Sequence, residues 1–271
     1  MATVGDSAGS GNGSLRERYP LQSWWHIAFY NFCNRLVHLV YVCCFRYRRY
    51  GRSRLPRTGA CILVCNHQSH LDPPAVGSLA MGRGVHFLAR GTLFNSPAFG
   101  WLIRKLNSIP LRRGEADLVA IKEALKRLES GAAMVVFAEG TRSEDGALKP
   151  FERGTLLLLR KSRCPIVPVA VEGFHDIWPK GQKRPQLFGG VSAGMIGEPI
   201  GHDELLKDGP DEALRRLARE IDAMRLELRA GLRERSHGKL PAPGPGDQAS
   251  DPSGWYQVPA SAETTKKAEP V

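Results

Sequence analysis

Apolar runs alternate with amphipathic stretches along the middle of this chain. Continuous apolar runs predict strands that are buried on both faces, at 60–65, 85–89, 133–138 and 165–171, with a shorter strand near 109–111. Helical segments are expected between them, at 72–80, 96–106, 116–130 and 155–161. This alternation with short links predicts an α/β fold with a largely parallel sheet flanked by helices.

Amphipathic stripes and local composition set the expected boundaries. A last helix is predicted to end near Arg235, because apolar residues recur at helical spacing before it: Leu214, Leu217, Ile221, Met224 and Leu228. Residues 236–271 are rich in Pro, Gly, Ser and Ala, which predicts a disordered tail. We expect a flexible arm over 1–20 and one folded domain over 51–235.

The segment 21–50 has a different character, because 22 largely apolar residues run from Trp24 to Phe45. As a helix this run could just span a bilayer, but Arg35 at its centre would cost ~2.5–3.5 kcal/mol. We therefore predict one or two helices that lie in the membrane interface, with a helix packed on the core as the alternative. No signal peptide is expected, since residues 1–14 lack a basic start leading into an apolar run.

The net charge of +11 points to a phosphate-bearing partner, either nucleic acid or an anionic membrane. Six arginines follow the apolar segment directly: Arg46, Arg48, Arg49, Arg52, Arg54 and Arg57. Near an anionic leaflet each would contribute ~1 kcal/mol. A nucleic-acid footprint would not need the apolar helix beside it, so we predict membrane association at the cytoplasmic face and no nucleic-acid partner.

The six cysteines show no disulfide-framework spacing, which favours buried thiols in a reducing compartment. Cys61 and Cys65 lie near His67 and His70, but their spacing fits no common zinc module. We therefore expect no metal site.

The stretch 65–74 holds a candidate acid–base pair. His67 and Asp72 follow a predicted buried strand, and sites in α/β sheets gather at the carboxyl ends of strands. A carboxylate bonded to one imidazole nitrogen fixes the tautomer, so that the other nitrogen can take a proton from a hydroxyl. A His and an Asp at this spacing often occur by chance, and His70 is a rival base on the same turn.

Two further stretches carry candidate anion-binding groups. The loop after the strand at 133–138 contains Glu139, Gly140, Thr141 and Arg142, where an arginine suits bidentate capture of phosphate. By itself such a loop is more often a plain turn. Arg90, Arg112 and Arg113 flank an apolar helical segment, which suits an amphiphilic substrate or, more simply, a core helix between solvated arginines.

Taken together, the motifs resemble those of the glycerophospholipid acyltransferase family typified by 1-acyl-glycerol-3-phosphate acyltransferase, and they occur in the same order. The N-H-x4-D motif is Asn66, His67 and Asp72; the second is Arg90, Leu93, Phe94, Pro97, Phe99, Gly100 and Trp101, followed by Ile109, Pro110 and Arg113; the third is 137–143; the fourth is 165–169. Two positions depart from the pattern: Ala138 replaces the usual proline, and Arg90 stands where lysine is commoner.

The resemblance implies a glycerol-3-phosphate acyltransferase-like domain over 51–235 with His67 as general base and Asp72 as its partner. It implies that Glu139, Gly140, Thr141 and Arg142 bind the acceptor, with Arg90 and Arg113 assisting. The donor would be an acyl-CoA or acyl-carrier-protein thioester, the acceptor a lysophospholipid, the product phosphatidate, and no cofactor or metal would be needed. The alternatives are another lysophospholipid or aminolipid acceptor, and a catalytically silent basic membrane-binding protein.

Direct acyl transfer is expected rather than an acyl-enzyme. No G-x-S-x-G elbow stands beside His67, and the thiols of Cys61 and Cys65 lie in a strand expected to be buried. The sequence does not identify the group that stabilises the oxyanion; backbone amides near Gly140 or Asn66 are candidates.

Overall fold

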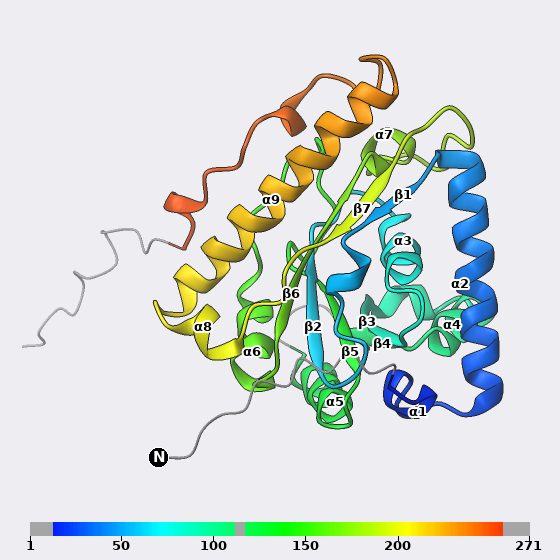
Figure 1. Cartoon of the computed structure of the whole chain (residues 1–271), viewed down its shortest axis with the longest axis vertical. Coiled ribbons are helices and arrows are strands. Elements are labelled where there is room, and N and C mark those ends of the chain that lie inside the picture. The colour runs from blue at the N-terminus through cyan, green and yellow to red at the C-terminus, as the bar shows by residue number, and fades with distance from the viewer. Residues whose placement is uncertain (1–12, 112–116, 257–271) are drawn as a thin grey trace, which may run out of the picture.

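A computed structural model describes residues 13–111 and 117–256 and shows a central sheet between two layers of helices (Figure 1). Its strands are β1 Arg48–Tyr50, β2 Cys61–Cys65, β3 Val85–Arg90, β4 Ser108–Leu111, β5 Ala133–Phe137, β6 Ile166–Glu172 and β7 Ala193–Ile196. The sheet order is β1-β7-β6-β2-β5-β3-β4, and every neighbouring pair is parallel except β6 with β7. The prediction of a largely parallel sheet is confirmed.

Helices cover both faces of the sheet. Their bounds are α1 Leu15–Arg18, α2 Trp24–Phe45, α3 Asp72–Leu79, α4 Pro97–Lys105, α5 Leu118–Glu129, α6 Arg153–Ser162, α7 Phe174–Ile177, α8 His202–Leu206 and α9 Pro210–Arg235, with short 3-10 turns η1 Arg52–Arg54, η2 Gly91–Phe94, η3 Pro245–Asp247 and η4 Pro252–Gly254. In Figure 1, α2 and α3 lie on one side of the sheet and α6, α8 and α9 on the other.

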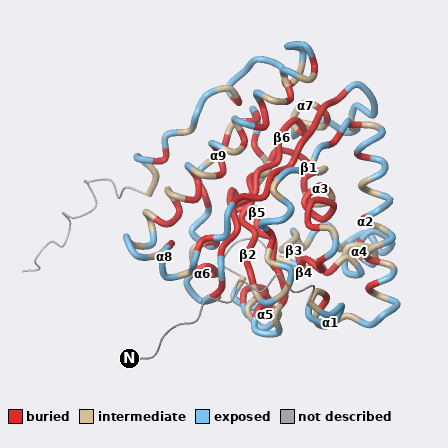
Figure 2. Tube along the Cα trace, viewed as in Figure 1, coloured by how far each residue is buried: buried red, intermediate tan, exposed pale blue. Residues whose placement is uncertain are grey.

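The core follows from the alternation of side chains along the buried strands. In β2, Leu63 packs with α2 and α3, whereas Ile62 and Val64 pack with α5, α6 and α9. Figure 2 shows buried residues concentrated in the sheet and on the helix faces turned toward it. The apolar runs of the sequence are therefore strands that need two helical layers to cover them.

The N-terminal apolar segment is one helix, α2, which is long and apolar enough to cross a membrane. One face packs on the domain, where Tyr30, Tyr41 and Phe45 are buried. The other face is open, with Trp25 87% and Phe32 63% exposed. The helix therefore combines the two alternatives from the sequence, because it is packed on the core along one side and leaves an apolar stripe on the other.

The basic run after α2 differs from the prediction. Residues 48–50 form β1, which is an edge strand of the sheet, so the domain begins before residue 51. Arg49 and Arg52 donate to backbone carbonyls at the end of α3, namely those of Ser78, Leu79 and Met81. The last carbonyl groups of a helix lack donors within the helix and favour cations. These two arginines therefore stabilise the end of α3 rather than extending toward a lipid leaflet.

Part of the predicted disordered tail also has a defined structure. Residues 236–256 run back along α9 and include η3 and η4 (Figure 1). Polar contacts from α9 hold this segment, which composition cannot reveal: Arg229 binds Asp247, and Asp222 accepts from Ser250 N. Residues 257–271 of the tail and 1–12 of the arm lie outside the described residues, and the arm residues that follow include the short helix α1.

Candidate active site

Three neighbouring parallel strands bring the predicted site residues to one edge of the sheet. His67 lies just after β2, the loop 139–142 just after β5, and Arg90 is the last residue of β3. In the sheet β5 lies between β2 and β3, so the three strand ends meet. This is the edge where ligands of α/β sheets bind.

His67 and Asp72 form the predicted pair. Asp72 Oδ2 lies 2.8 Å from His67 Nδ1. The side chain of Asp72 is fully buried and that of His67 is 18% exposed. Because the carboxylate can only accept, Nδ1 carries the proton and Nε2 is left with its lone pair. The accessible nitrogen is thus the basic one, as a general base requires.

The turn between the two residues is built around that carboxylate. Asp72 Oδ2 also accepts from the backbone N–H groups of Gln68, at 2.6 Å, and Ser69, at 2.7 Å. The His67 ring stacks on Phe137, with 4.3 Å between ring centroids. Three donors on one oxygen and a ring stack on the other side fix the orientation of the imidazole.

The carboxylate of Asp72 bonds to the ring of His67, whereas the ring of His70, the rival base, has a different neighbour. Its ring packs against Trp178 at 5.1 Å between centroids. Burial lowers the pKa of His70, and the charge of Arg142 lowers it further. The geometry therefore favours His67 as the base.

Glu139 is held by backbone N–H groups. Its Oε1 accepts from His67 N at 2.7 Å, its Oε2 accepts from Lys149 N at 3.2 Å, and the residue is 2% exposed. Burial raises the pKa of Glu139 to about 8, against the opposing effect of these two donors. A carboxyl group occupied in this way holds two loop segments together, and its contact with the acceptor stays a prediction.

The next residues form the exposed part of the loop. Gly140 adopts φ +62°, and a Cβ there would lie 2.6 Å from Glu152 Cγ, so glycine is needed for both the conformation and the space. Thr141 is half-buried between Gly140 and Arg142. The predicted loop therefore turns sharply and exposes its end at the edge that also carries His67.

Arg142 is the best-placed anion-binding side chain among the described residues. Its Nη1 is buried without a hydrogen-bond partner in that part of the chain. Burial lowers the pKa of Arg142, the charge of Asp72 opposes this, and nearby Arg90 adds to the lowering. Two guanidinium groups within electrostatic range of one another have the donors that would suit a phosphate. Arg113, predicted to assist, lies outside the described residues.

The backbone amides suggested for the oxyanion are partly occupied. His67 N donates to Glu139, and Gly140 N donates to the carbonyl of Phe137 at 3.1 Å. Asn66 uses its side chain to join β2 to β6, because it exchanges two hydrogen bonds with the backbone of Val171. Asn66 therefore anchors the strand end that carries His67.

Sequence reasoning missed the side chains that brace the site from behind. Gln68, buried beside His67, donates to the carbonyl of Gly146 and to Glu172. Tyr41 of α2 donates to the carbonyl of Leu71, next to Asp72. The only available signal was position, since Gln68 lies within the His67 motif and Glu172 ends a predicted strand.

Other chemistry at this edge is not favoured by the geometry. Burial raises the pKa of the Cys61 thiol to about 11 and that of Cys65 well above its usual range, so neither is an activated thiolate. Within residues 13–111 and 117–256, no three His, Cys, Asp or Glu side chains come together as metal ligands.

Known acyltransferases have sequences similar to that of this chain. The acyltransferase family model matches residues 46–172, which contain every predicted site residue. A chloroplastic 1-acyl-sn-glycerol-3-phosphate acyltransferase of Brassica napus is 32% identical over 55% of this chain and 44% of its own length. A 1-acyl-sn-glycerol-3-phosphate acyltransferase of Bacillus subtilis is 26% identical over 63% of this chain and 82% of its own.

The fold has a solved counterpart. The crystal structure of the 1-acyl-sn-glycerophosphate acyltransferase PlsC from Thermotoga maritima matches with a TM-score of 0.64 and 27% identity, over 76% of this chain and 80% of that one. The chain spans about half the length of the plant relatives it matches, 44% and 48% for two chloroplastic enzymes. In its motifs and its fold, the chain is similar to members of the glycerophospholipid acyltransferase family.

Proposed function

We propose that this protein transfers a fatty acyl group from a thioester donor to the free hydroxyl of 1-acyl-glycerol-3-phosphate, giving phosphatidate. The observation that carries the proposal is the buried Asp72 carboxylate bonded to His67 Nδ1, which leaves Nε2 free beside two arginines. The relatives named above act on the same substrate by name, which supports this choice of acceptor.

The transfer needs one base, and no acyl-enzyme forms. His67 Nε2 takes the proton of the acceptor hydroxyl as its oxygen attacks the thioester carbonyl. The tetrahedral intermediate then expels the thiolate, which receives that proton from the imidazolium. Asp72 stabilises the imidazolium while it carries the proton. The donor is acyl-CoA or acyl-carrier protein as co-substrate, and no cofactor or metal takes part.

The acceptor is held by its phosphate. Arg142, with its unpartnered Nη1, is the main anchor, and Arg90 is the second. A guanidinium presents two parallel N–H donors to a phosphate, which fixes the direction as well as the position of the bound group. The glycerol hydroxyl of the acceptor then lies toward His67.

The membrane lipid surface is the proposed partner of α2 and α4. Trp101 of α4 is 55% exposed, and its ring contacts Phe29 of α2, so the two helices form one apolar surface. An amphiphilic acceptor and exposed aromatic side chains both suit the lipid interface. With a net charge of +11, the anionic cytoplasmic face of a membrane is the proposed location.

The test is phosphatidate formation from a long-chain acyl-CoA and 1-acyl-glycerol-3-phosphate in vesicles. We expect turnover by the wild type and a loss of about 10²–10⁴-fold in His67→Ala, the contribution typical of a general base. His202→Ala is the matched control, because His202 also pairs with a carboxylate at 2.8 Å but lies on α8.

The possible outcomes separate the parts of the proposal. Equal rates for wild type and His67→Ala would disprove the role of the base. If the folded wild type gives no product, the acceptor or the donor is wrong, and acyl-carrier-protein donors, other lysophospholipids and aminolipids are the next substrates to test.

A further inference from the structure

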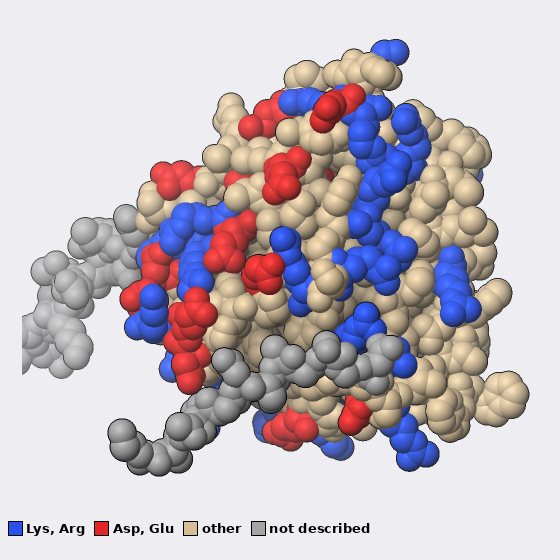
Figure 3. All heavy atoms as spheres, in the orientation of Figure 1, with Lys and Arg blue, Asp and Glu red and all other residues tan. Residues whose placement is uncertain are grey.

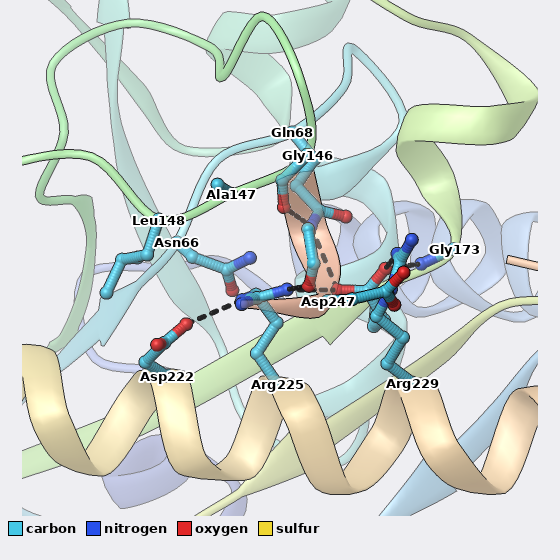
Figure 4. A network of polar contacts seen from close by, with 12 residues as sticks. Asn66, Gln68, Gly146, Ala147, Leu148, Gly173, Asp222, Arg225, Arg229 and Asp247 are labelled. Carbon is cyan, nitrogen blue, oxygen red and sulfur yellow. Dashed lines mark hydrogen bonds and ion pairs between the residues drawn. The ribbon is translucent and has the colours of Figure 1, made fainter. Parts of the chain in front are cut away.

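A buried cluster of charges lies behind the catalytic turn (Figure 4). Glu172, the last residue of β6, is fully buried, and so is Arg225 of α9; Arg229, one turn further along α9, is 5% exposed. Removing charges from water costs several kcal/mol for each ion unless partners compensate. The proposed reaction does not use these groups, so their burial requires another explanation.

Glu172 connects the cluster to the turn that carries His67. Its Oε1 accepts from Arg229 Nη1 at 2.8 Å, and its Oε2 accepts from Gln68 Nε2 at 3.0 Å and from Arg225 Nη1 at 3.4 Å. Gln68 is the neighbour of His67 in the chain. The Gln68 side chain is thus the link between the base and the buried charges.

The side-chain amide of Gln68 also contacts the loop after β5. Gln68 Nε2 donates to the carbonyl of Gly146 at 2.9 Å, in the loop that begins with Glu139. One side chain therefore ties the turn after β2, the loop after β5 and the end of β6 together. Figure 4 shows Gln68 and Gly146 on one side of the cluster and the α9 arginines on the other.

The segment 236–256 closes the cluster from outside; we call it the C-terminal strap. Arg225 Nη1 donates to the carbonyl of Gly246 at 2.6 Å, and Arg229 Nε donates to Asp247 Oδ1 at 2.6 Å. A Cβ at Gly246 would lie 3.3 Å from the carbonyl oxygen of Gly146, so the strap packs against the catalytic loop itself.

We propose that Gln68 and Glu172 are positioning residues for His67, and that the C-terminal strap supports the active site by fixing Arg225 and Arg229. This inference rests on the proposed acyltransferase function. Buried ion pairs often add little stability compared with apolar packing, whereas a catalytic group must stay within about 0.5 Å of its working position. A displacement of about 1 Å can cost ~10²-fold in rate, even when its cause is remote.

The test is a double-mutant cycle on kcat. Gln68→Met cuts the link without leaving a buried charge unpaired. Arg229→Lys keeps a positive charge for Glu172 but loses the forked bonds to Asp247 and to the carbonyl of Ala242. We expect kcat to fall about 10-fold in Gln68→Met and about 5-fold in Arg229→Lys, with KM for both substrates within about twofold.

The decisive result is the double variant. Once Gln68 no longer connects the cluster to the turn, Arg229→Lys should cause no further loss of kcat. A merely structural effect of Arg229 would lower kcat equally in both backgrounds, and such additivity would overturn the proposal. Arg216→Lys is the matched control, because Arg216 also lies on α9 with two carboxylate partners, Glu204 and Glu220, but away from the cluster.

A second measurement does not depend on turnover. The N–H groups of Gln68 and Ser69 donate to Asp72, so their hydrogen exchange reports the order of the catalytic turn. We expect faster exchange there in Gln68→Met and Arg229→Lys and unchanged exchange in Arg216→Lys. If the wild type has no activity on the proposed substrates, this readout still decides the inference, and unchanged exchange in all three variants would disprove it.

Discussion

The turn after β2 and the loop after β5 meet at His67, but they are held in place by different means. The turn is organised from within, since the Asp72 carboxylate accepts from the His67 ring and from two backbone N–H groups of the turn. The loop is held mainly by backbone contacts with the turn: Glu139 accepts from His67 N and also from Lys149 N further along the loop, and Ser143 N donates to the carbonyl of His67 at 2.7 Å.

This difference separates two uses of a buried carboxylate. Asp72 faces the ring that is proposed to take the proton, so the proposed reaction depends on the charge and the position of Asp72. Both hydrogen bonds to Glu139 come from backbone N–H groups, so the conformation of the loop depends directly on Glu139. The proposed reaction depends on Glu139 only through that conformation. Substitutions in the two regions should therefore affect different quantities, the catalytic rate in one and the stability of the fold in the other.

The largest effect is expected from Asp72→Asn. An amide oxygen in the place of Oδ2 can still accept from Gln68 N, Ser69 N and His67 Nδ1, but the group no longer carries the charge that stabilises the imidazolium. We expect kcat to fall about 10³–10⁴-fold with little change in the melting temperature, measured by acyl transfer and by thermal unfolding.

Asp145→Asn is the control for this experiment. Asp145 lies in the loop after β5, where its Oδ1 accepts from Ser143 Oγ and Ala147 N. An equal loss of kcat in both variants would mean that the rate depends as much on an aspartate of the loop as on Asp72. The rate would then not depend specifically on the turn.

The sequence predicted the turn better than the loop, and the reason is physical. Periodicity located β2, β3 and β5, but it did not give their order in the sheet, so only the family resemblance assigned His67, Arg90 and Arg142 to one site. The partners of Glu139 could not be predicted, because they are backbone N–H groups, which leave no signal in residue identity. The family resemblance supplied residue identities, and its assignment of Glu139 to the acceptor stays a prediction.

The fold shows the same limit. Strands with continuous apolar runs were predicted within a residue or two, whereas β1 was taken for part of a basic membrane-docking segment because arginines dominate it. The C-terminal strap was predicted as disordered because Pro and Gly dominate its composition, and the buried arginines that hold it lie on α9. Long-range polar pairing leaves no periodic signal in a sequence.

A smaller effect, on stability, is expected from Gly140→Ala in the loop. The left-handed backbone costs a non-glycine residue about 1–2 kcal/mol, and the added Cβ would press on Glu152. We expect the free energy of unfolding to fall by about 1–3 kcal/mol in urea denaturation. Gly154→Ala is the control: it lies in α6 with open space around it and should gain up to about 1 kcal/mol. Equal stability of the two variants would contradict a strained loop.

A further effect is the pH dependence of stability, which tests whether Glu139 is neutral in the folded protein. Its pKa is about 8 when folded, against an ordinary value of 4.5, because burial disfavours the charge. Between these values the unfolded chain has lost the proton that the folded protein keeps, so unfolding releases a proton and rising pH favours it. The wild type should lose on the order of 1 kcal/mol per pH unit across this window relative to Glu139→Gln, which cannot titrate. Urea denaturation of both proteins from pH 5 to pH 9 measures the difference, which should stop growing above about pH 8. Parallel stability curves would mean that the two N–H donors keep Glu139 ionised, and Glu139 and Asp72 would then differ in what they face but not in their charge.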